Sequence, residues 1–162
     1  DITVMPPTTT AKEIAALKPD GIFLSNGPGD PKVLTSAVEE VKQMMKLEIP
    51  IFGICLGHQI MSLAYDLKIE KMPFGHHGAN HPVHDLKNNT VFITSQNHNF
   101  AVANIEDRSD VVVTHKSLFD GSIQGIEHND KPFYSIQCHP EASPGPKEFE
   151  VLFERFFEDM NA

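Results

Sequence analysis

Short apolar runs alternate with amphipathic segments over the first 66 residues. Residues 21–25 and 49–54 are apolar runs of strand length, and the segments 11–18, 33–45 and about 57–66 carry apolar positions at helical spacing. Strands that alternate with helices at this spacing are typical of βαβ units, in which helices cover a parallel sheet. We therefore expect the first part of the chain to form a parallel α/β unit.

The second half has a different pattern. Residues 90–95, 110–115, 122–126 and 133–138 are β-rich runs separated by turn residues, with no helical segment between them. These runs predict antiparallel additions to the sheet. A final amphipathic helix over about 147–160 follows, and its expected buried stripe is formed by Phe149, Leu152, Phe153, Phe156 and Phe157.

Together the patterns predict one α/β domain of three layers over residues 1–162. Its central sheet is expected to be mixed and mainly parallel, with the strand 49–54 near the middle. The run at 2–4 is too short for a first strand. We therefore expect the chain to be a fragment of a longer polypeptide, lacking an upstream strand.

Charge and cysteine content narrow the class of protein. The formal net charge is −9, which repels phosphate backbones and anionic lipid, so we expect neither nucleic acid nor membrane partners. There is no apolar run long enough to cross a bilayer and no signal-like start, so a cytoplasmic protein is expected. Two cysteines, Cys55 and Cys138, imply no disulfide framework.

The sharpest chemical signal is the sequence GICLG at 53–57, between an apolar run and a predicted helix. A G-x-C-x-G at such a junction predicts a nucleophile elbow, in which Cys55 stands at the helix N-terminus. There we expect the helix dipole to stabilise a thiolate and the N–H of Leu56 to face a developing oxyanion. The competing interpretation is a buried structural cysteine.

A thiolate nucleophile needs a base, and the base needs an orienting acceptor. The sequence HPE at 139–141 follows the β-rich run 133–138, so His139 is expected at the carboxyl end of a strand, with Glu141 beside its imidazole. Most of the nine histidines must serve packing or the surface. The HPE spacing distinguishes His139 from the others.

The sequences FGICLGHQ at 52–59 and CHPE at 138–141 resemble those of the class I, or triad, glutamine amidotransferases. The resemblance implies that family's three-layer fold and a triad of Cys55 as nucleophile, His139 as general acid and base, and Glu141 as orienting carboxylate. It also implies L-glutamine as substrate, a γ-glutamyl thioester intermediate and released ammonia.

Further segments look like those of carbamoyl-phosphate synthetase small subunits: LSNGPGDP at 24–31, FGHHGANHPV at 74–83, TSQNHNFAV at 94–102 and THKSLFDGSIQGI at 114–126 with PEASPGP at 140–146. The likeness implies an N-terminal domain upstream and, as partner, the large synthetase subunit, with a product that feeds arginine biosynthesis, pyrimidine biosynthesis or both. It implies no cofactor in this chain, because ATP and magnesium belong to the large subunit. The carried-over substrate positions are Gly27, Gly29, Leu56, Gln59, Asn97, Asn99 and Phe100, with Gly27 as second oxyanion donor.

Three features stand apart from the family pattern. The family usually has glycine where this chain has Asn99; asparagine tolerates positive φ, but its side chain could alter glutamine affinity. Cys138 is interpreted as a small core residue. His76, His77, His81 and His84 are close in sequence and resemble metal ligands, but they lack a helical register and a cysteine pair, and the matching family segment needs no metal. We therefore expect structural histidines near the active site and no metal.

Two alternatives remain open. One is the glutaminase component of another triad amidotransferase, such as an anthranilate or nucleotide synthetase. The other is a catalytically inactive interaction module. An ordinary glycine-rich turn is likewise the alternative interpretation of the GPG at 27–29.

Overall fold

The computed structural model describes residues 1–105, 108–142 and 148–162. Its α-helices are α1 (Ala11–Leu17), α2 (Thr35–Met44), α3 (Leu56–Ala64) and α4 (Val151–Met160), with short 3₁₀ turns at Pro31–Val33, Met45–Leu47 and Glu148–Glu150. Its strands are β1 (Ile22–Leu24), β2 (Ile51–Ile54), β3 (Ile69–Asp85), β4 (Thr90–Val102), β5 (Val111–Ser117), β6 (Ile123–His128) and β7 (Phe133–Ile136). All the predicted helices and strands are present, with shifted boundaries.

The strands form one mixed sheet in the order β1-β2-β7-β6-β4-β3-β5. Only β1–β2 and β2–β7 pair in parallel, and every other pairing is antiparallel. The expectation of a mainly parallel sheet is therefore wrong, because the antiparallel additions outnumber the βαβ unit. The strand β2 also lies second from the edge rather than near the middle.

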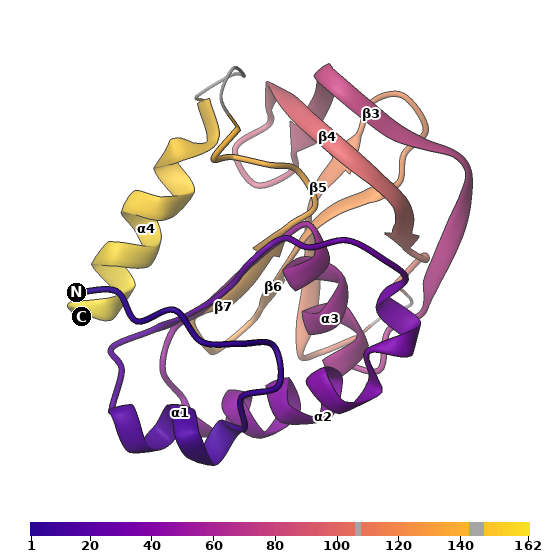
Figure 1. The fold of residues 1–162 in the computed structure, drawn as a ribbon. Helices are drawn as coiled ribbons and strands as arrows, with labels where there is room; N and C mark the ends of the chain where they lie inside the picture. Colours follow the sequence, from indigo (N-terminus) through magenta and orange to yellow (C-terminus); the bar gives the residue numbers. More distant parts are fainter. Residues whose placement is uncertain (106–107, 143–147) are drawn as a thin grey trace.

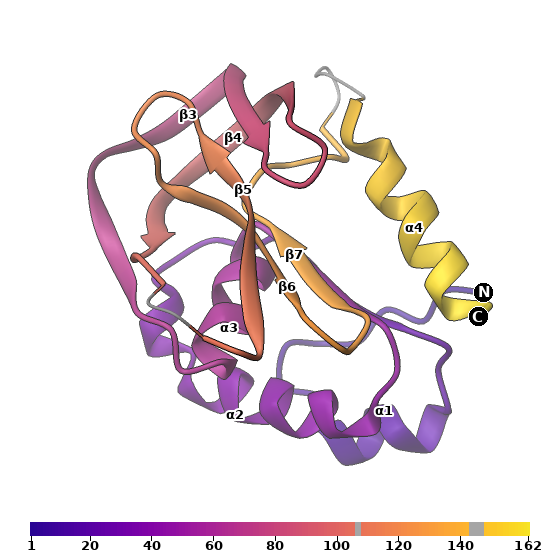
Figure 2. The same cartoon turned by 180° about the vertical axis from the view of Figure 1, so that it is seen from behind.

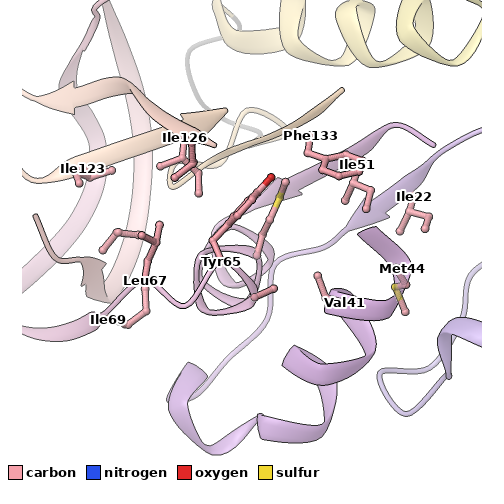
Figure 3. Close-up of a cluster of buried hydrophobic side chains, with 14 of the residues drawn as sticks. Ile22, Val41, Met44, Ile51, Tyr65, Leu67, Ile69, Ile123, Ile126 and Phe133 are labelled. Carbon is pink, nitrogen blue, oxygen red and sulfur yellow. The ribbon is translucent and has the colours of Figure 1, made fainter. Parts of the chain in front are cut away.

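Helices cover both faces of this sheet, so the domain has the predicted three layers. The helices α1, α2 and α3 lie on one face, and α4 lies alone on the other (Figures 1 and 2). Figure 3 shows the core between the sheet and the first group, where Val41 and Met44 of α2 face Ile22 and Ile51. A second core joins α4 to the opposite face of the sheet; its buried members are Phe52, Ile54, Val83, Tyr134, Ile136, Cys138, Phe149 and Phe156.

Two details of the helices test the sequence patterns. The helix α1 begins with a reciprocal cap, because the Thr10 side chain accepts from the Glu13 N–H and the Thr10 N–H donates to Glu13. In α4, Phe156 is buried as expected but Phe157 is 66% exposed, so the predicted stripe was one residue too wide. No helix in the described ranges has the length and apolar content to cross a bilayer.

The long strand β3 is absent from the sequence-based prediction. It contains Pro73, Gly75, Gly78 and Pro82, and its pairing with β4 shifts register between Lys71 and His76 and again between Gly78 and His81. Glycine, proline and bulges break the alternation of apolar and polar positions by which strands are recognised. The partner β4 continues to Val102, well past the predicted end at residue 95, and this added length contributes to the candidate site.

Candidate active site

The elbow at Cys55 has a strained backbone. Cys55 has φ 47° and ψ −106°, a conformation that residues with a side chain rarely adopt. The flanking glycines make it possible: a Cβ on Gly53 would lie 2.9 Å from the Gly57 carbonyl, and one on Gly57 would lie 2.0 Å from the Leu24 oxygen. The predicted elbow is confirmed, with Cys55 between the end of β2 and the first residue of α3.

The sulfur of Cys55 is buried beneath strand β4. The residue is 5% exposed, and Sγ faces the backbone carbonyl of Asn97 at 3.9 Å. Burial raises the pKa of the thiol to about 11, and the charge of Glu141 acts in the same direction. The N–H of Leu56 and the side-chain amide of Gln137 lower this pKa. The start of α3 therefore lowers the pKa of Cys55 as predicted, but burial has the larger effect, so the resting group is a thiol.

His139 and Glu141 form the predicted pair. The His139 Nδ1 lies 2.8 Å from Glu141 Oε1, so a carboxylate acceptor places the ring proton on Nδ1. The other nitrogen, Nε2, is buried and has no hydrogen-bond partner among the residues that the structure describes. A neutral imidazole held in this way presents an unoccupied acceptor on Nε2.

Three backbone contacts bring Cys55 and His139 to the same edge of the sheet. The strands β2 and β7 are parallel neighbours with Ile54 opposite Ile136, so their carboxyl ends meet. The N–H of His139 donates to the Ser95 carbonyl at 2.9 Å, two residues before the Asn97 carbonyl that faces the sulfur. The nucleophile candidate and the base candidate therefore both lie against one short stretch of β4.

The loop after β1 reaches this edge as well. A Cβ on Gly27 would lie 2.8 Å from the Leu56 side chain, so Gly27 packs directly on the first residue of α3. Gly29 has φ +103°, and its Cα faces open space. Gly27 and Leu56, the two residues predicted as oxyanion donors, are therefore neighbours, and a side chain at position 27 would have to displace the end of the Leu56 side chain.

Gln59 and Phe100 are brought together by a hydrogen bond. Gln59 is 3% exposed, and its Nε2 donates to the Phe100 carbonyl at 2.9 Å and to Gln137 Oε1 at 3.0 Å. The side chain therefore links α3 to β4 and β7 one turn after Cys55. Its hydrogen bonds within the protein are more extensive than a substrate-contact role alone requires.

Asn97 and Asn99 share one partner that the sequence did not indicate. His77 on β3 lies directly opposite Asn97, with Nδ1 2.9 Å from Asn97 Oδ1 and Nε2 3.1 Å from Asn99 Oδ1. Gly75, at φ +64°, leaves room for this bridge, because a Cβ there would lie 2.6 Å from Asn99 Oδ1. Both asparagine side chains are exposed and held by the same imidazole.

The remaining histidines do not form a metal centre. Among the described residues there is no group of three His, Cys, Asp or Glu side chains placed to hold an ion. Instead His76 binds Asp120 at 2.9 Å, and His76 and His81 pack ring to ring with centroids 5.0 Å apart. His84 binds Asn89 at 3.0 Å.

Sequence reasoning missed Gln137, and it placed His77 near the active site as a structural histidine without predicting its bridge to the two asparagines. Gln137 directly precedes Cys138-His139 and is fully buried, and a polar residue at the end of an apolar strand was the available signal. His77 belongs to the bulged strand β3, which was itself missed. Cys138 is a free, buried thiol of the second core, as predicted.

Comparisons with known proteins identify relatives of this chain. A family model described as glutamine amidotransferase class-I matches residues 1–159. The carbamoyl phosphate synthase small chain of Buchnera aphidicola is 55% identical over 159 residues, which are 98% of this chain and 40% of that protein. The small chain of Photorhabdus laumondii is 57% identical over 157 residues, 97% of this chain and 41% of its own length.

A solved structure shares the fold. A putative GMP synthase subunit from Thermoplasma acidophilum matches with a TM-score of 0.83 and 22% identity, covering 98% of this chain and 80% of that one. At this identity the likeness concerns the fold alone. The present chain spans about 40% of the length of the small chains it matches. With its family model covering nearly every residue, the chain belongs to the class-I glutamine amidotransferase family.

Proposed function

We propose that this domain hydrolyses L-glutamine to glutamate and ammonia with Cys55, His139 and Glu141 as its triad. The observation that carries the proposal is the strained elbow, which holds Cys55 at φ 47° between Gly53 and Gly57. A side chain at either glycine would clash with neighbouring backbone, so no other residue can replace them. Strain at one buried, nucleophilic residue is typical of catalytic sites. The hydrogen-bonded His139–Glu141 pair at the same sheet edge supplies the matching base.

The first half-reaction transfers the γ-glutamyl group. His139 Nε2 takes the proton from Cys55 Sγ while sulfur attacks the side-chain amide carbon of glutamine. The N–H groups of Leu56 and Gly27 stabilise the resulting oxyanion. His139 then gives the proton to the amide nitrogen, the C–N bond breaks, and ammonia leaves behind a thioester.

The second half-reaction hydrolyses the thioester and regenerates the free enzyme. Water gives a proton to His139 and attacks the thioester carbonyl, the C–S bond breaks, and the sulfur recovers the proton as glutamate departs. The resting thiol explains why a base is needed, because a pKa of about 11 leaves little thiolate near neutral pH. Because the sulfur is buried, the Cys55 thiol becomes nucleophilic only when His139 accepts its proton.

We further propose that glutamine binds over α3, where Gly29 offers an open backbone and β4 provides Asn97, Asn99 and Phe100. Gln59 supports this wall by its bond to the Phe100 carbonyl. The exposed amide of Asn97 is suited to the polar α-substituents of the substrate, whereas Asn99 contributes its backbone and has its side chain held by His77.

The proposal extends to the whole protein through its relatives. Identity of 55–57% to carbamoyl phosphate synthase small chains supports the same role here, with ammonia passing to a large subunit that binds ATP and magnesium. This chain would then need no cofactor. Its two free thiols accord with a cytoplasmic protein, and its product would feed arginine biosynthesis, pyrimidine biosynthesis or both.

Ammonia release from glutamine tests the proposal, with the protein purified alone and with a carbamoyl phosphate synthase large chain. Cys55→Ser should lower the rate at least about a thousandfold while the fold is kept. The matched control, Cys138→Ala, alters the other buried cysteine and should retain most activity. Retained hydrolysis by Cys55→Ser would overturn the proposal.

Two further measurements separate the alternatives. Ammonia release without carbamoyl phosphate formation beside the large chain would indicate another amidotransferase. A diazo-ketone analogue of glutamine should label Cys55, as read by mass spectrometry of its peptide. An unlabelled Cys55 in folded protein would indicate an inactive interaction module.

A further inference from the structure

The orientation of the Gln137 side-chain amide is fixed by its neighbours. Gln59 Nε2 donates to the Phe100 carbonyl, which can only accept, so this end of the Gln59 amide must be its NH₂ group. The same nitrogen donates to Gln137 at 3.0 Å, so the Gln137 atom facing it must be the oxygen. The Gln137 NH₂ group therefore faces away from Gln59.

That NH₂ group lacks a partner in the resting site. Gln137 is fully buried, and its Nε2 forms no hydrogen bond with any described residue. A buried donor left unpaired costs about 1–3 kcal/mol, so native proteins rarely keep one without a use. Gln137 also cannot turn away, because its Oε1 is held by Gln59 and its backbone N–H donates to the Gln124 carbonyl at 2.7 Å.

The unpaired donor lies beside the nucleophile. The N–H of Cys55 donates to the carbonyl of Ile136, the residue before Gln137, at 3.0 Å. Gln59, which holds the Gln137 oxygen, donates its own backbone N–H to the Cys55 carbonyl at 3.1 Å. The hydrogen bond that the Gln137 amide can offer to this sulfur lowers the pKa of the Cys55 thiol, and Nε2 of that amide has no other partner among the described residues.

We propose that the Gln137 side-chain N–H is a catalytic donor to the Cys55 sulfur whenever that sulfur is negatively charged. Sulfur carries charge twice in the proposed reaction: when His139 has removed its proton, and when the C–S bond breaks and sulfur leaves as thiolate. A hydrogen bond to a charged group is stronger than one to a neutral group, so the donor favours these states over the resting thiol. This inference rests on the proposed glutaminase function.

The pH dependence of Cys55 alkylation by iodoacetamide tests the proposal without requiring turnover. The full-length protein, with its partner subunit where it co-purifies, is compared with Gln137→Met, which keeps the size of the side chain but removes its donor. At pH 8–9 the Cys55 peptide should be alkylated about ten- to hundredfold more slowly in the variant, with the pH profile displaced upward. The kcat for glutamine should fall by a similar factor with KM changed less than about twofold.

A matched control is available on the neighbouring strand. Gln124 is equally buried, but its amide binds Ser122 and Gln96 instead of facing the sulfur. Gln124→Met should therefore leave the alkylation profile of Cys55 unchanged. A purely structural role for Gln137 predicts that both variants lose stability and that neither moves the profile.

The outcomes distinguish this inference from the proposed function. An unchanged alkylation profile in folded Gln137→Met overturns the donor role, whether or not the protein hydrolyses glutamine. A displaced profile in a protein that releases no ammonia keeps the donor and overturns the glutaminase. Should Gln137→Met fail to fold, Gln137→Asn replaces it in the test, because it keeps a polar amide on a side chain that is one methylene shorter. The pH profile of Cys55 alkylation must then show the same upward displacement.

Discussion

The backbone N–H of Cys55 donates to the carbonyl of Ile136 at 3.0 Å, only three residues before His139. The turn that presents the nucleophile is thus hydrogen-bonded to the strand that leads to its base. Residues from β2 and β7, which are far apart along the chain, are joined by one parallel pairing. The geometry of the site depends on this register.

Gly57→Ala should disrupt the elbow. Its new Cβ would lie 2.0 Å from the Leu24 carbonyl, a backbone atom that cannot move aside without shifting β1. We expect a loss of about 3 kcal/mol in the free energy of unfolding, measured in urea, with loss of glutaminase activity.

Gly121→Ala provides the comparison for this steric effect. Gly121 has φ +73° with open space around it, so alanine there adds backbone strain of about 1 kcal/mol but no clash. Equal losses for the two variants would contradict the role assigned to the Gly57–Leu24 contact.

Glu141→Gln should change two properties of the site in opposite directions. The charge of Glu141 raises the pKa of Cys55, so its removal should lower that pKa and speed alkylation a few-fold at pH 8. Glutamine hydrolysis should nevertheless fall about tenfold or more, because His139 loses its carboxylate acceptor. Glu154→Gln, on the exposed face of α4, should alter neither; slower alkylation in Glu141→Gln would refute the electrostatic account.

The His77 bridge predicts a non-additive pair of substitutions. If His77 holds the Asn99 side chain clear of the substrate, His77→Ala should raise KM for glutamine about two- to tenfold. Asn99→Gly, which restores the residue usual in the family, should lower KM and make it insensitive to His77→Ala. Strictly additive effects in the four-member cycle would show that the bridge does not act through Asn99.

Stability should decline in mild acid. Burial lowers the pKa of His58 to about 3 and those of His98 and His115 to about 4, whereas an unfolded chain titrates near 6.5. Because the unfolded chain then binds more protons, the free energy of unfolding is greatest above pH 6.5 and falls as the pH drops towards 4. Urea unfolding at pH 7.5, 6 and 5 should show this decline, and His115→Asn should make it shallower; a flat profile would contradict it.

Local signals predicted the elbow and the HPE pair because the residues of each motif lie close together in the sequence. The glycines at 53 and 57 lie two residues either side of Cys55, and Glu141 reaches His139 across one proline. The order of the sheet was predicted less well, since β2 pairs with β7 although β3 to β6 lie between them in the sequence. Such pairings follow from packing of the whole domain and leave no local pattern.

The errors have related physical causes. Gln137 was passed over because its function depends on Gln59, a residue on another element. The strand β3 was missed because its bulges and its exposed Phe74 do not alternate. The raised pKa of Cys55 was not predicted, because the sequence indicates a helix start but not the burial of the sulfur against β4.

Strand β4 touches both halves of the chemistry, through the Ser95 carbonyl that receives the His139 N–H and the Asn97 carbonyl above the sulfur. The two reactive groups therefore cannot be adjusted separately by movement of this strand. A slide or tilt of the β3–β4 hairpin would change the position of the His139 imidazole and the burial of the Cys55 thiol at the same time. A contact made at the distant end of the hairpin would therefore affect both groups together.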